Sequence, residues 1–426
     1  MHDNSLHIDL GQDLSSNEIV SISEKGLYQN MLITGAIGSG KTSSAMYPIT
    51  RQLIAYKSSN LHEKLGMLIL DVKGNYIYQV ENYAKLYNRE KDIIPIQISG
   101  EFKYNPLDNI ALKPTVLANR LKTILLLFSP NNTESYWIDK SETVLAEAIK
   151  LCRLYNNGYE LHNLITNHDY YFEKINTLRN KFLKHKFNSD QNYDLLSALN
   201  FFEKEFYSLD SRTFNILKSE ITRITSCFVS DSDVLKTFCP EKSKNNFPGF
   251  QNIIESGKIV ILNMNINEYK NLSKIIATYL KLDFQTEVLR RLATNSTNIH
   301  PVAFISDEYS EYVSATDANF FSQSRESKCI NIVSTQSYTS LLNALNNKYS
   351  VEVIVQNLVN KLWFRSDDMF TIEDAQKQLR KNRCRKNFKN HIRKCKGDIL
   401  QLYYAFITIK KFQYFRKYKY LYTTRL

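Results

Sequence analysis

Short apolar runs recur along the chain and are separated by longer segments with helical spacing. Six runs have the length of a buried strand: 31–34 (MLIT), 66–71 (GMLILD), 258–263 (KIVILN), 301–308 (PVAFISDE), 330–336 (INIVSTQ) and 361–365 (KLWFR). Largely apolar strands that alternate with helices indicate a mostly parallel sheet covered on both faces. The pattern therefore predicts an α/β fold. Pro48 interrupts the helical segment 41–56, so we expect a kink or a shortened helix there.

The pattern changes between about 111 and 249, where no clear parallel-strand signal is present. Apolar residues there repeat at intervals of three and four, which is typical of amphipathic helices. The clearest examples are VLANRLKTILLLF, WIDKSETVLAEAIKLCRLY, DLLSALNFFEKEF and FNILKSEITRITSCFV. We interpret this stretch as an all-helical domain inserted between the two halves of the α/β domain.

A glycine-rich loop follows the first apolar run and opens into a segment with helical spacing. The stretch GAIGSGKT fits G-x-x-x-x-G-K-[ST] and supplies the nucleotide-binding candidates Gly35, Gly38, Ser39, Gly40, Lys41 and Thr42. Glycines allow backbone angles that turn successive N–H groups inward, and the next helix adds its positive end. We expect Lys41 to reach the β- and γ-phosphates of ATP and Thr42 to bind Mg²⁺. A strand before the loop and a helix after it disfavour a plain glycine-rich surface loop.

Two adjacent acids, Asp307 and Glu308, end the apolar run PVAFIS. Acids at the end of a buried strand are costly unless they have partners or a task. The same pattern also occurs by chance before a solvated turn, but the phosphate loop upstream favours a Walker B element. Asp307 is then expected to hold Mg²⁺, usually through water, and Glu308 to activate the attacking water. Asp71 and Gln336 follow other apolar runs, so we expect them at the same edge of the sheet.

The formal net charge of +12 is unevenly distributed. Residues 377–426 contain 16 Lys and Arg and one acid, Asp398, which leaves 39 basic and 42 acidic residues elsewhere. A basic tail with interleaved aromatic residues can bind DNA or an anionic membrane surface. It can equally be a solvated end without a partner. The net charge of the whole chain is therefore no argument that the body of the protein, residues 1–376, binds nucleic acid.

Several classes of protein and site are disfavoured. No run of about 18 apolar residues is present, so we expect no transmembrane helix. The N-terminal stretch MHDNSLHIDL is polar and unlike a signal peptide. The six cysteines include no CxxC pair, which disfavours a zinc site and fits reduced thiols of a cytoplasmic protein.

Stretches in most of the chain, from about 30 to 378, resemble type IV secretion coupling proteins of the TraG/TraD class. They are GAIGSGKT, LILDVKGN, YNPLDNI, YWIDKSETVLAEAIKL, FISDEYSEYV with the downstream FFSQSRESKCINIVSTQSYTSL, and KLWFRSDDMFTIEDAQKQ. The resemblance implies a hexameric RecA-like motor with ATP and Mg²⁺ as cofactors. Such motors couple ATP hydrolysis to moving DNA, usually with a bound relaxase, from the cytoplasm into a secretion channel.

The resemblance also implies roles for residues that spacing alone leaves unassigned. Gln336 lies where the family has a polar sensor of the γ-phosphate. Arg325 lies where a basic residue reaches the nucleotide of a neighbouring subunit, although a surface salt bridge is an equal alternative. Lys73, in DVKGN, matches a family element close to the nucleotide, and no role follows for it from the sequence.

Both ends of the chain depart from the family. Most members have transmembrane helices ahead of the phosphate loop, whereas residues 1–30 are short and largely polar. We therefore expect either a shortened form or a protein held by a partner at the inner face of the cell membrane. After Gln378 the family pattern fades into the basic aromatic tail.

The predicted fold is a RecA-like P-loop NTPase with a mostly parallel sheet and an inserted all-α domain. We divide the chain into 1–110 with Walker A, 111–249 as the inserted helical domain, 250–376 with Walker B and the sensor, and the tail 377–426. Two alternative functions remain open. One is a HerA/FtsK-like motor on double-stranded DNA in packaging, segregation or defence. The other is an ATP-dependent adaptor that recruits protein substrates to a secretion channel, which the near-neutral body permits.

Overall fold

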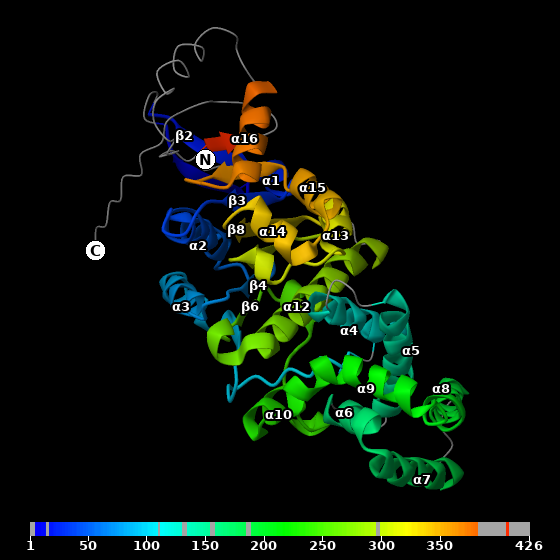
Figure 1. Ribbon diagram of the computed structural model, residues 1–426. Coiled ribbons are helices and arrows are strands. Elements are labelled where there is room, and N and C mark those ends of the chain that lie inside the picture. The colour runs from blue at the N-terminus through cyan, green and yellow to red at the C-terminus, as the bar shows by residue number, and fades with distance from the viewer. Residues whose placement is uncertain are drawn as a thin grey trace. The chain divides into compact units, whose positions relative to one another are not determined.

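The computed structural model of the 426-residue chain describes residues 5–13, 17–109, 111–129, 134–153, 158–184, 189–294, 299–381 and 406–408. The chain divides into two compact units (Figure 1). The first comprises Met1–Ile94, Phe250–Ile261 and Phe284–Leu426, and the second comprises Pro95–Gly249 and Leu262–Asp283.

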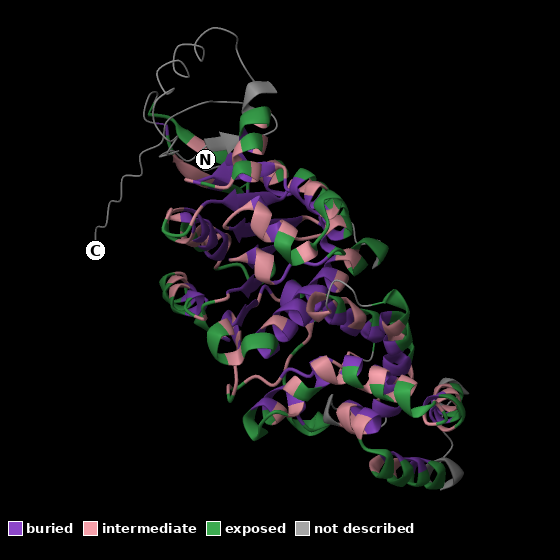
Figure 2. Cartoon of the chain, viewed as in Figure 1, coloured by how far each residue is buried: buried purple, intermediate pink, exposed green. Residues whose placement is uncertain are grey.

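An eight-stranded sheet with the order β10-β9-β3-β8-β7-β4-β6-β5 is the main feature of the first unit. All six expected strands are present: β3 (Met31–Thr34), β4 (Gly66–Leu70), β6 (Ile259–Leu262), β7 (Val302–Ser306), β8 (Cys329–Thr335) and β9 (Asn360–Trp363). These six pair in parallel with one another. Every residue of the six strands is buried, as expected for a sheet covered on both faces (Figure 2). The predicted α/β fold class is confirmed.

Four strands were not predicted. β1 (His7–Gln12) and β2 (Ile19–Ser23) form a separate antiparallel pair. β5 (Ile93–Ile96) lies at an edge of the main sheet, where Pro95 is tolerated because an edge strand needs fewer N–H donors. β10 (Phe406–Thr408) pairs antiparallel with β9. Most of the basic tail, on which the DNA-binding expectation partly depends, lies outside the described residues.

The segment 41–56 is helical but begins with a π-helical turn. This turn, η1 (Thr42–Met46), is followed by α2 (Tyr47–Ala55), with Pro48 in the first turn of α2. The N–H group of Tyr47 donates to the carbonyl oxygen of Thr42, five residues back. Pro48 has no N–H to donate and therefore belongs near a helix start. The expected irregularity at Pro48 is a change of helix type just before it.

Helices of the first unit cover the sheet. They are α1 (Glu24–Leu27), α2, α3 (Tyr76–Leu86), α11 (Phe250–Glu255), α13 (Asp317–Gln323), α14 (Tyr338–Leu345), α15 (Lys348–Asn357) and α16 (Met369–Lys381). Ile49 and Leu53 of α2 and Val80 of α3 belong to one buried cluster with Ile33 of β3 and Ile69 of β4. The amphipathic faces of these two helices therefore bury one face of the sheet.

The second unit is helical, as expected. It contains α4 (Pro114–Phe128), α5 (Ser135–Cys152), α6 (Gly158–Thr166), α7 (His168–Lys184), α8 (Ser189–Phe201), the π-turn η3 (Phe202–Phe206), α9 (Ser211–Thr225) and α10 (Ser232–Phe238). The described residues of 111–249 include no strand. The long helix α12 (Ile266–Arg290) is broken at Lys270 and contributes its first part to this unit. Among the described residues, no helix is long and apolar enough to cross a membrane.

Candidate active site

Four neighbouring strands bring the predicted site together at one edge of the sheet. Their order is β3, β8, β7 and β4, and they run parallel. The carboxyl ends of parallel strands meet at the same edge, which is where ligands of such sheets bind. The phosphate loop follows β3, Gln336 follows β8, Asp307 and Glu308 follow β7, and Asp71 follows β4.

Three glycines of the phosphate loop are required by its shape. Gly38 and Gly40 have φ angles of 73° and 91°, in the left-handed region that favours glycine. Gly35 is required for lack of space, because a Cβ atom at this position would lie only 2.5 Å from Cβ of Phe364. The N–H group of Ala36 donates to the carbonyl oxygen of Arg365 at 2.7 Å. β9 and its extension therefore support the loop from one side.

The loop offers donors that the described residues do not satisfy. The N–H groups of Gly38 and Gly40 donate to no acceptor among the described residues. The hydroxyl oxygen of Ser39 is buried and also has no partner there. The start of the next helix leaves further N–H groups unpaired. Free donors beside a helix N-terminus fit a polyphosphate.

Lys41 is buried rather than exposed, with only 6 % of its surface accessible. Its Nζ atom donates to the carbonyl oxygens of Gly35 at 2.6 Å and Ala36 at 3.4 Å. Burial lowers the pKa of Lys41, and the charges of Glu308 and Asp307 oppose that shift. The ammonium therefore lies inside the loop, against backbone oxygens that a phosphate can replace as its partner.

Asp307 and Thr42 are brought together as expected of a magnesium site. The Thr42 hydroxyl donates to one carboxylate oxygen of Asp307 at 2.9 Å. The other oxygen accepts hydrogen bonds from the Ser334 hydroxyl and, at 3.0 Å, from the N–H group of Glu308. Carboxylate and hydroxyl oxygens are ligands that Mg²⁺ prefers. Ser334 was not predicted, although its place in the run INIVST, beside the strand of Asp307, could have indicated it.

Glu308 has a strained backbone and a partner from the neighbouring strand. Its φ and ψ angles are 47° and 48°, a left-handed conformation that is uncommon for residues other than glycine and often marks functional sites. The Gln336 side-chain amide donates to the Glu308 carboxylate at 3.3 Å. Burial and the charge of Asp307 raise the pKa of Glu308, against the opposing effects of Lys41, Gln336 and Lys73. Gln336 therefore orients Glu308 in this structure.

Asp71 lies at the expected edge but has a structural task. Its carboxylate accepts hydrogen bonds from the N–H groups of Lys73, Asn75 and Tyr76 at 3.0–3.1 Å. It thereby closes the turn after β4 and caps α3. Burial raises the pKa of Asp71, and the backbone donors counteract the shift. We therefore assign Asp71 to positioning of the loop and not to ligand binding.

Arg325 is not brought to the phosphate loop of its own chain. It lies in the turn between α13 and β8, at the amino end of β8 and thus at the opposite edge of the sheet. The side chain is exposed and has no ion-pair partner among the described residues. The salt-bridge alternative finds no support there, and the nucleotide of a neighbouring subunit remains the prediction.

No protein-family model and no curated protein matches the sequence, whereas solved structures do. The unbound monoclinic form of the bacterial conjugative coupling protein TrwBΔN70 superposes with a TM-score of 0.58 and 12 % identity, over 89 % of this chain and 77 % of that chain. Plasmid coupling protein TrwB with ADP and Mg²⁺ superposes with a TM-score of 0.54 and 13 % identity, over 80 % of this chain and 70 % of that chain. VirB4 of Thermoanaerobacter pseudethanolicus superposes with a TM-score of 0.52 and 15 % identity, over 88 % of each chain. The expected resemblance is confirmed in the fold, which this chain shares with the coupling protein TrwB and with VirB4.

Proposed function

We propose that this protein is an ATP-hydrolysing coupling protein that drives DNA, together with a relaxase, into a type IV secretion channel. The observation that carries the proposal is the Thr42–Asp307 hydrogen bond beside Glu308, opposite a loop with free N–H donors. TrwB, whose fold is shared, has been solved with ADP and Mg²⁺ and with analogues of GTP and ATP. ATP and Mg²⁺ are accordingly the proposed cofactors.

Each residue of the site has a task in this proposal. The loop N–H groups and the Lys41 ammonium bind the β- and γ-phosphates, and Thr42 and Asp307 hold Mg²⁺. Bound Mg²⁺ supplies positive charge against the phosphate oxygens. The Glu308 carboxylate orients a water molecule and takes its proton as the water attacks the terminal phosphorus, and the bond from that phosphorus to the bridging oxygen breaks to release ADP. Gln336, already hydrogen-bonded to Glu308, is the proposed γ-phosphate sensor.

Arg325 completes the site only in an assembly. It lies at the amino end of β8, away from the phosphate loop of its own chain, which supports its assignment to the nucleotide of a neighbouring copy. We propose a homo-hexamer in which each Arg325 stabilises charge on the transferred phosphate of the next subunit. Channel components and the secretion substrate are the other proposed partners, and one of them holds the motor peripherally at the membrane.

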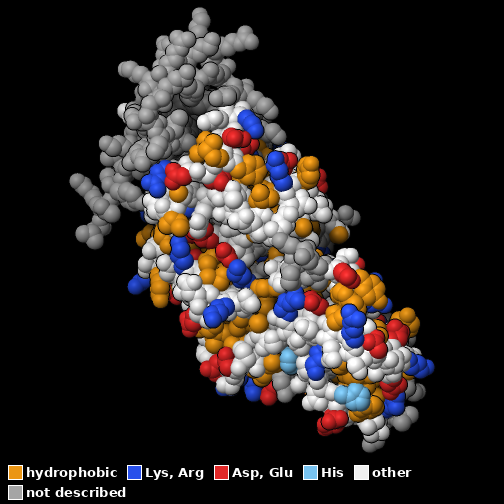
Figure 3. All heavy atoms as spheres, viewed as in Figure 1, with side chains coloured by type: hydrophobic (Ala, Val, Ile, Leu, Met, Phe, Trp, Pro, Cys, Tyr) orange, Lys and Arg blue, Asp and Glu red, His pale blue; other side chains and the backbone are white. Residues whose placement is uncertain are grey.

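The surface of the body is compatible with several substrates. On the face shown in Figure 3, Lys and Arg side chains are interspersed with Asp and Glu side chains. This distribution agrees with the 39 basic and 42 acidic residues outside the tail. Bulk charge therefore does not distinguish single- from double-stranded DNA, nor conjugation from a HerA/FtsK-like task.

ATP hydrolysis with and without DNA tests the proposal. We expect single-stranded DNA to stimulate hydrolysis by the full chain and Lys41→Ala to remove both basal and stimulated turnover. Stronger stimulation by duplex DNA than by single strands would favour the HerA/FtsK-like alternative. Hydrolysis that neither form of DNA changes would refute a DNA motor and leave the adaptor function.

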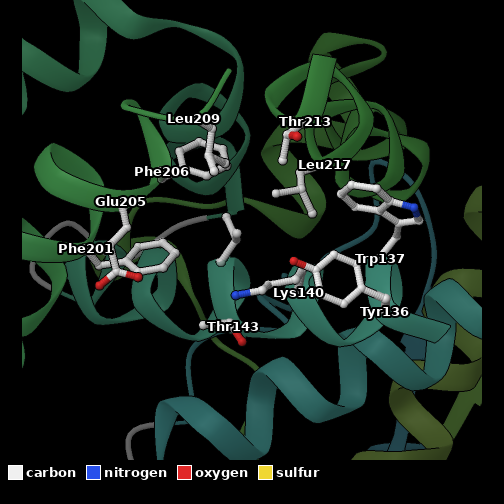
Figure 4. A pocket seen from close by; sticks show the side chains of 11 residues that line it. Tyr136, Trp137, Lys140, Thr143, Phe201, Glu205, Phe206, Leu209, Thr213 and Leu217 are labelled. Atoms are coloured by element: carbon white, nitrogen blue, oxygen red, sulfur yellow. The ribbon is translucent and has the colours of Figure 1, made fainter. Parts of the chain in front are cut away.

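One observation favours the adaptor function as a second candidate. The helical unit has a pocket between α5, the α8–η3 segment and α9 (Figure 4). Aromatic and aliphatic side chains dominate its lining, with one lysine and one glutamate: Tyr136, Trp137, Lys140, Thr143, Val144, Phe201, Glu205, Phe206, Leu209, Thr213 and Leu217. Apolar pockets with a few polar groups are typical binding sites. Loss of a co-purified secretion substrate in Trp137→Ala, with ATP binding retained, would support this candidate.

A further inference from the structure

Lys73 lies at the same edge of the sheet as the phosphate loop and has no role in the site described so far. It follows the carboxyl end of β4 by three residues. The Asp71 carboxylate accepts the N–H group of Lys73 at 3.1 Å, which fixes the turn that carries it. The Lys73 side chain is exposed and has no hydrogen bond or ion pair with any described residue. A fixed turn thus presents an unpaired ammonium.

The strand order shows where this ammonium approaches from. β8 and β7 separate β3 from β4, and a strand spacing of ~4.8 Å places β4 about 14 Å from β3. Lys41 therefore belongs to the loop after β3 and Lys73 to the turn after β4, and Glu308 follows β7, which lies between these two strands. The N–H group of Asp307 donates to the carbonyl oxygen of Leu70 at 3.0 Å. The last residues of β4 and β7 are therefore paired, and the loops that follow them begin side by side at the carboxyl edge of the sheet.

The charges of the edge interact with one another. Burial lowers the pKa of Lys41, and the positive charge of Lys73 lowers it further. Glu308 and Asp307 oppose these effects, and each acts on Lys41 more strongly than Lys73 does. An additional anion between the two lysines would be stabilised by both.

We propose that Lys73 contacts the terminal phosphate of a bound nucleoside triphosphate and lets the site distinguish a triphosphate from a diphosphate. The proposal rests on the proposed function of the loop as a nucleotide site. The loop N–H groups and Lys41 bind the β- and γ-phosphates, and Lys73, in the turn after β4, is the second cation for the terminal one. A diphosphate lacks that phosphate, so its affinity does not depend on Lys73.

Equilibrium binding of two probes, ADP and the non-hydrolysable β,γ-imido analogue of ATP, tests the proposal in the presence of Mg²⁺. We expect Lys73→Met to weaken binding of the triphosphate by roughly tenfold or more, as for the loss of a charge-assisted hydrogen bond. ADP affinity should change less than about twofold, the range typical of surface substitutions. Lys73→Arg should keep most of the preference because it retains the charge.

Lys85 provides a matched control, because it is an exposed lysine at the other end of α3. Lys85→Met should leave both affinities unchanged. Equal weakening of ADP and the triphosphate analogue in Lys73→Met would overturn the proposal, as would no change in either. A wild-type protein that binds neither probe would instead refute the proposed nucleotide site.

Discussion

The hydroxyl oxygen of Thr42 lies 2.9 Å from a carboxylate oxygen of Asp307, although 265 positions separate the two residues in the chain. Parallel pairing of β3 with β8 and of β8 with β7 produces this closeness. Asp307 directly follows β7, and Thr42 begins the helical turn after the loop that follows β3. The order of the strands in the sheet therefore brings the two residues together.

A pair of substitutions at Thr42 tests the metal role of this contact. Thr42→Val keeps the shape of the side chain but removes the hydroxyl, so we expect Mg²⁺-dependent tightening of nucleotide binding to be lost and hydrolysis to fall by about 10²-fold or more. Thr42→Ser keeps the hydroxyl and should remain near wild type. Nucleotide affinity with and without Mg²⁺, together with turnover, is the measurement. Equal behaviour of the valine and serine variants would contradict the assignment.

Glu308 combines a chemical role with backbone strain, and two substitutions separate them. Glu308→Gln should bind ATP but hydrolyse it about 10²-fold or more slowly, because the carboxylate base is lost. Glycine tolerates the left-handed conformation better than alanine does. The free energy of unfolding of Glu308→Gly, measured with denaturant, should therefore exceed that of Glu308→Ala by about 1 kcal/mol. If the alanine and glycine variants are equally stable, the strain has no energetic weight. Normal turnover of the glutamine variant would place the base elsewhere.

The sequence predicted the six parallel strands well because each is a buried apolar run with a distinct start and end. It did not predict β5, whose run IIPI is short and contains Pro95. The sequence also did not predict that Lys41 is buried, because its burial depends on how the loop folds around its Nζ atom, which donates to the carbonyl oxygen of Gly35. Asp71 and Asp307 look alike in sequence, each an acid after an apolar run. Only the structure shows that the Asp71 carboxylate accepts hydrogen bonds from backbone N–H groups of its own turn. The Asp307 carboxylate instead accepts a hydrogen bond from the side-chain hydroxyl of Thr42.

Lys361 gives a prediction on stability. It is 5 % exposed in β9, donates to the carbonyl oxygen of Val355 at 3.0 Å, and burial lowers its pKa to about 8. The folded state therefore disfavours the charged form, and this cost is fully present below about pH 8. As the pH rises from about 8 toward the pKa of the unfolded chain, the cost disappears because the unfolded chain loses its proton as well.

Lys361→Met should accordingly stabilise the protein at pH 7, by about 1–3 kcal/mol after loss of the hydrogen bond. The gain should shrink as the pH rises above 8. Denaturant unfolding of both proteins at pH 7 and at pH 10 measures it. Lys85→Met, at an exposed position, serves as the control and should change stability by less than about 0.5 kcal/mol. Destabilisation by Lys361→Met at pH 7 would show that the ammonium is well accommodated.

Mixed assemblies test whether Arg325 acts on a neighbouring subunit. Arg325→Ala subunits keep an intact nucleotide site but supply no arginine, whereas Lys41→Ala subunits supply the arginine but have a defective site. Each variant alone should be nearly inactive, and mixing them should restore part of the hydrolysis. Mixing Lys41→Ala with a variant at exposed Arg212, Arg212→Ala, controls for simple dilution. Full activity of Arg325→Ala by itself would show that the arginine is not required.

The basic tail gives the last prediction. α16 continues to Lys381 and β10 pairs with β9, so deletion from Lys377 onward would cut a helix and remove a strand from the sheet. Replacing the lysines and arginines between 382 and 405 by glutamine avoids both defects. We expect basal ATP hydrolysis to be unchanged and DNA affinity at low salt to fall. The logarithmic salt dependence should become shallower by roughly 0.7 per lost phosphate contact with single strands. Glutamine at the same number of exposed lysines in the helical unit is the control. Identical affinities and slopes across a salt series would show that the basic residues of 382–405 do not contact DNA, since phosphate contacts cannot be removed without changing the release of counterions.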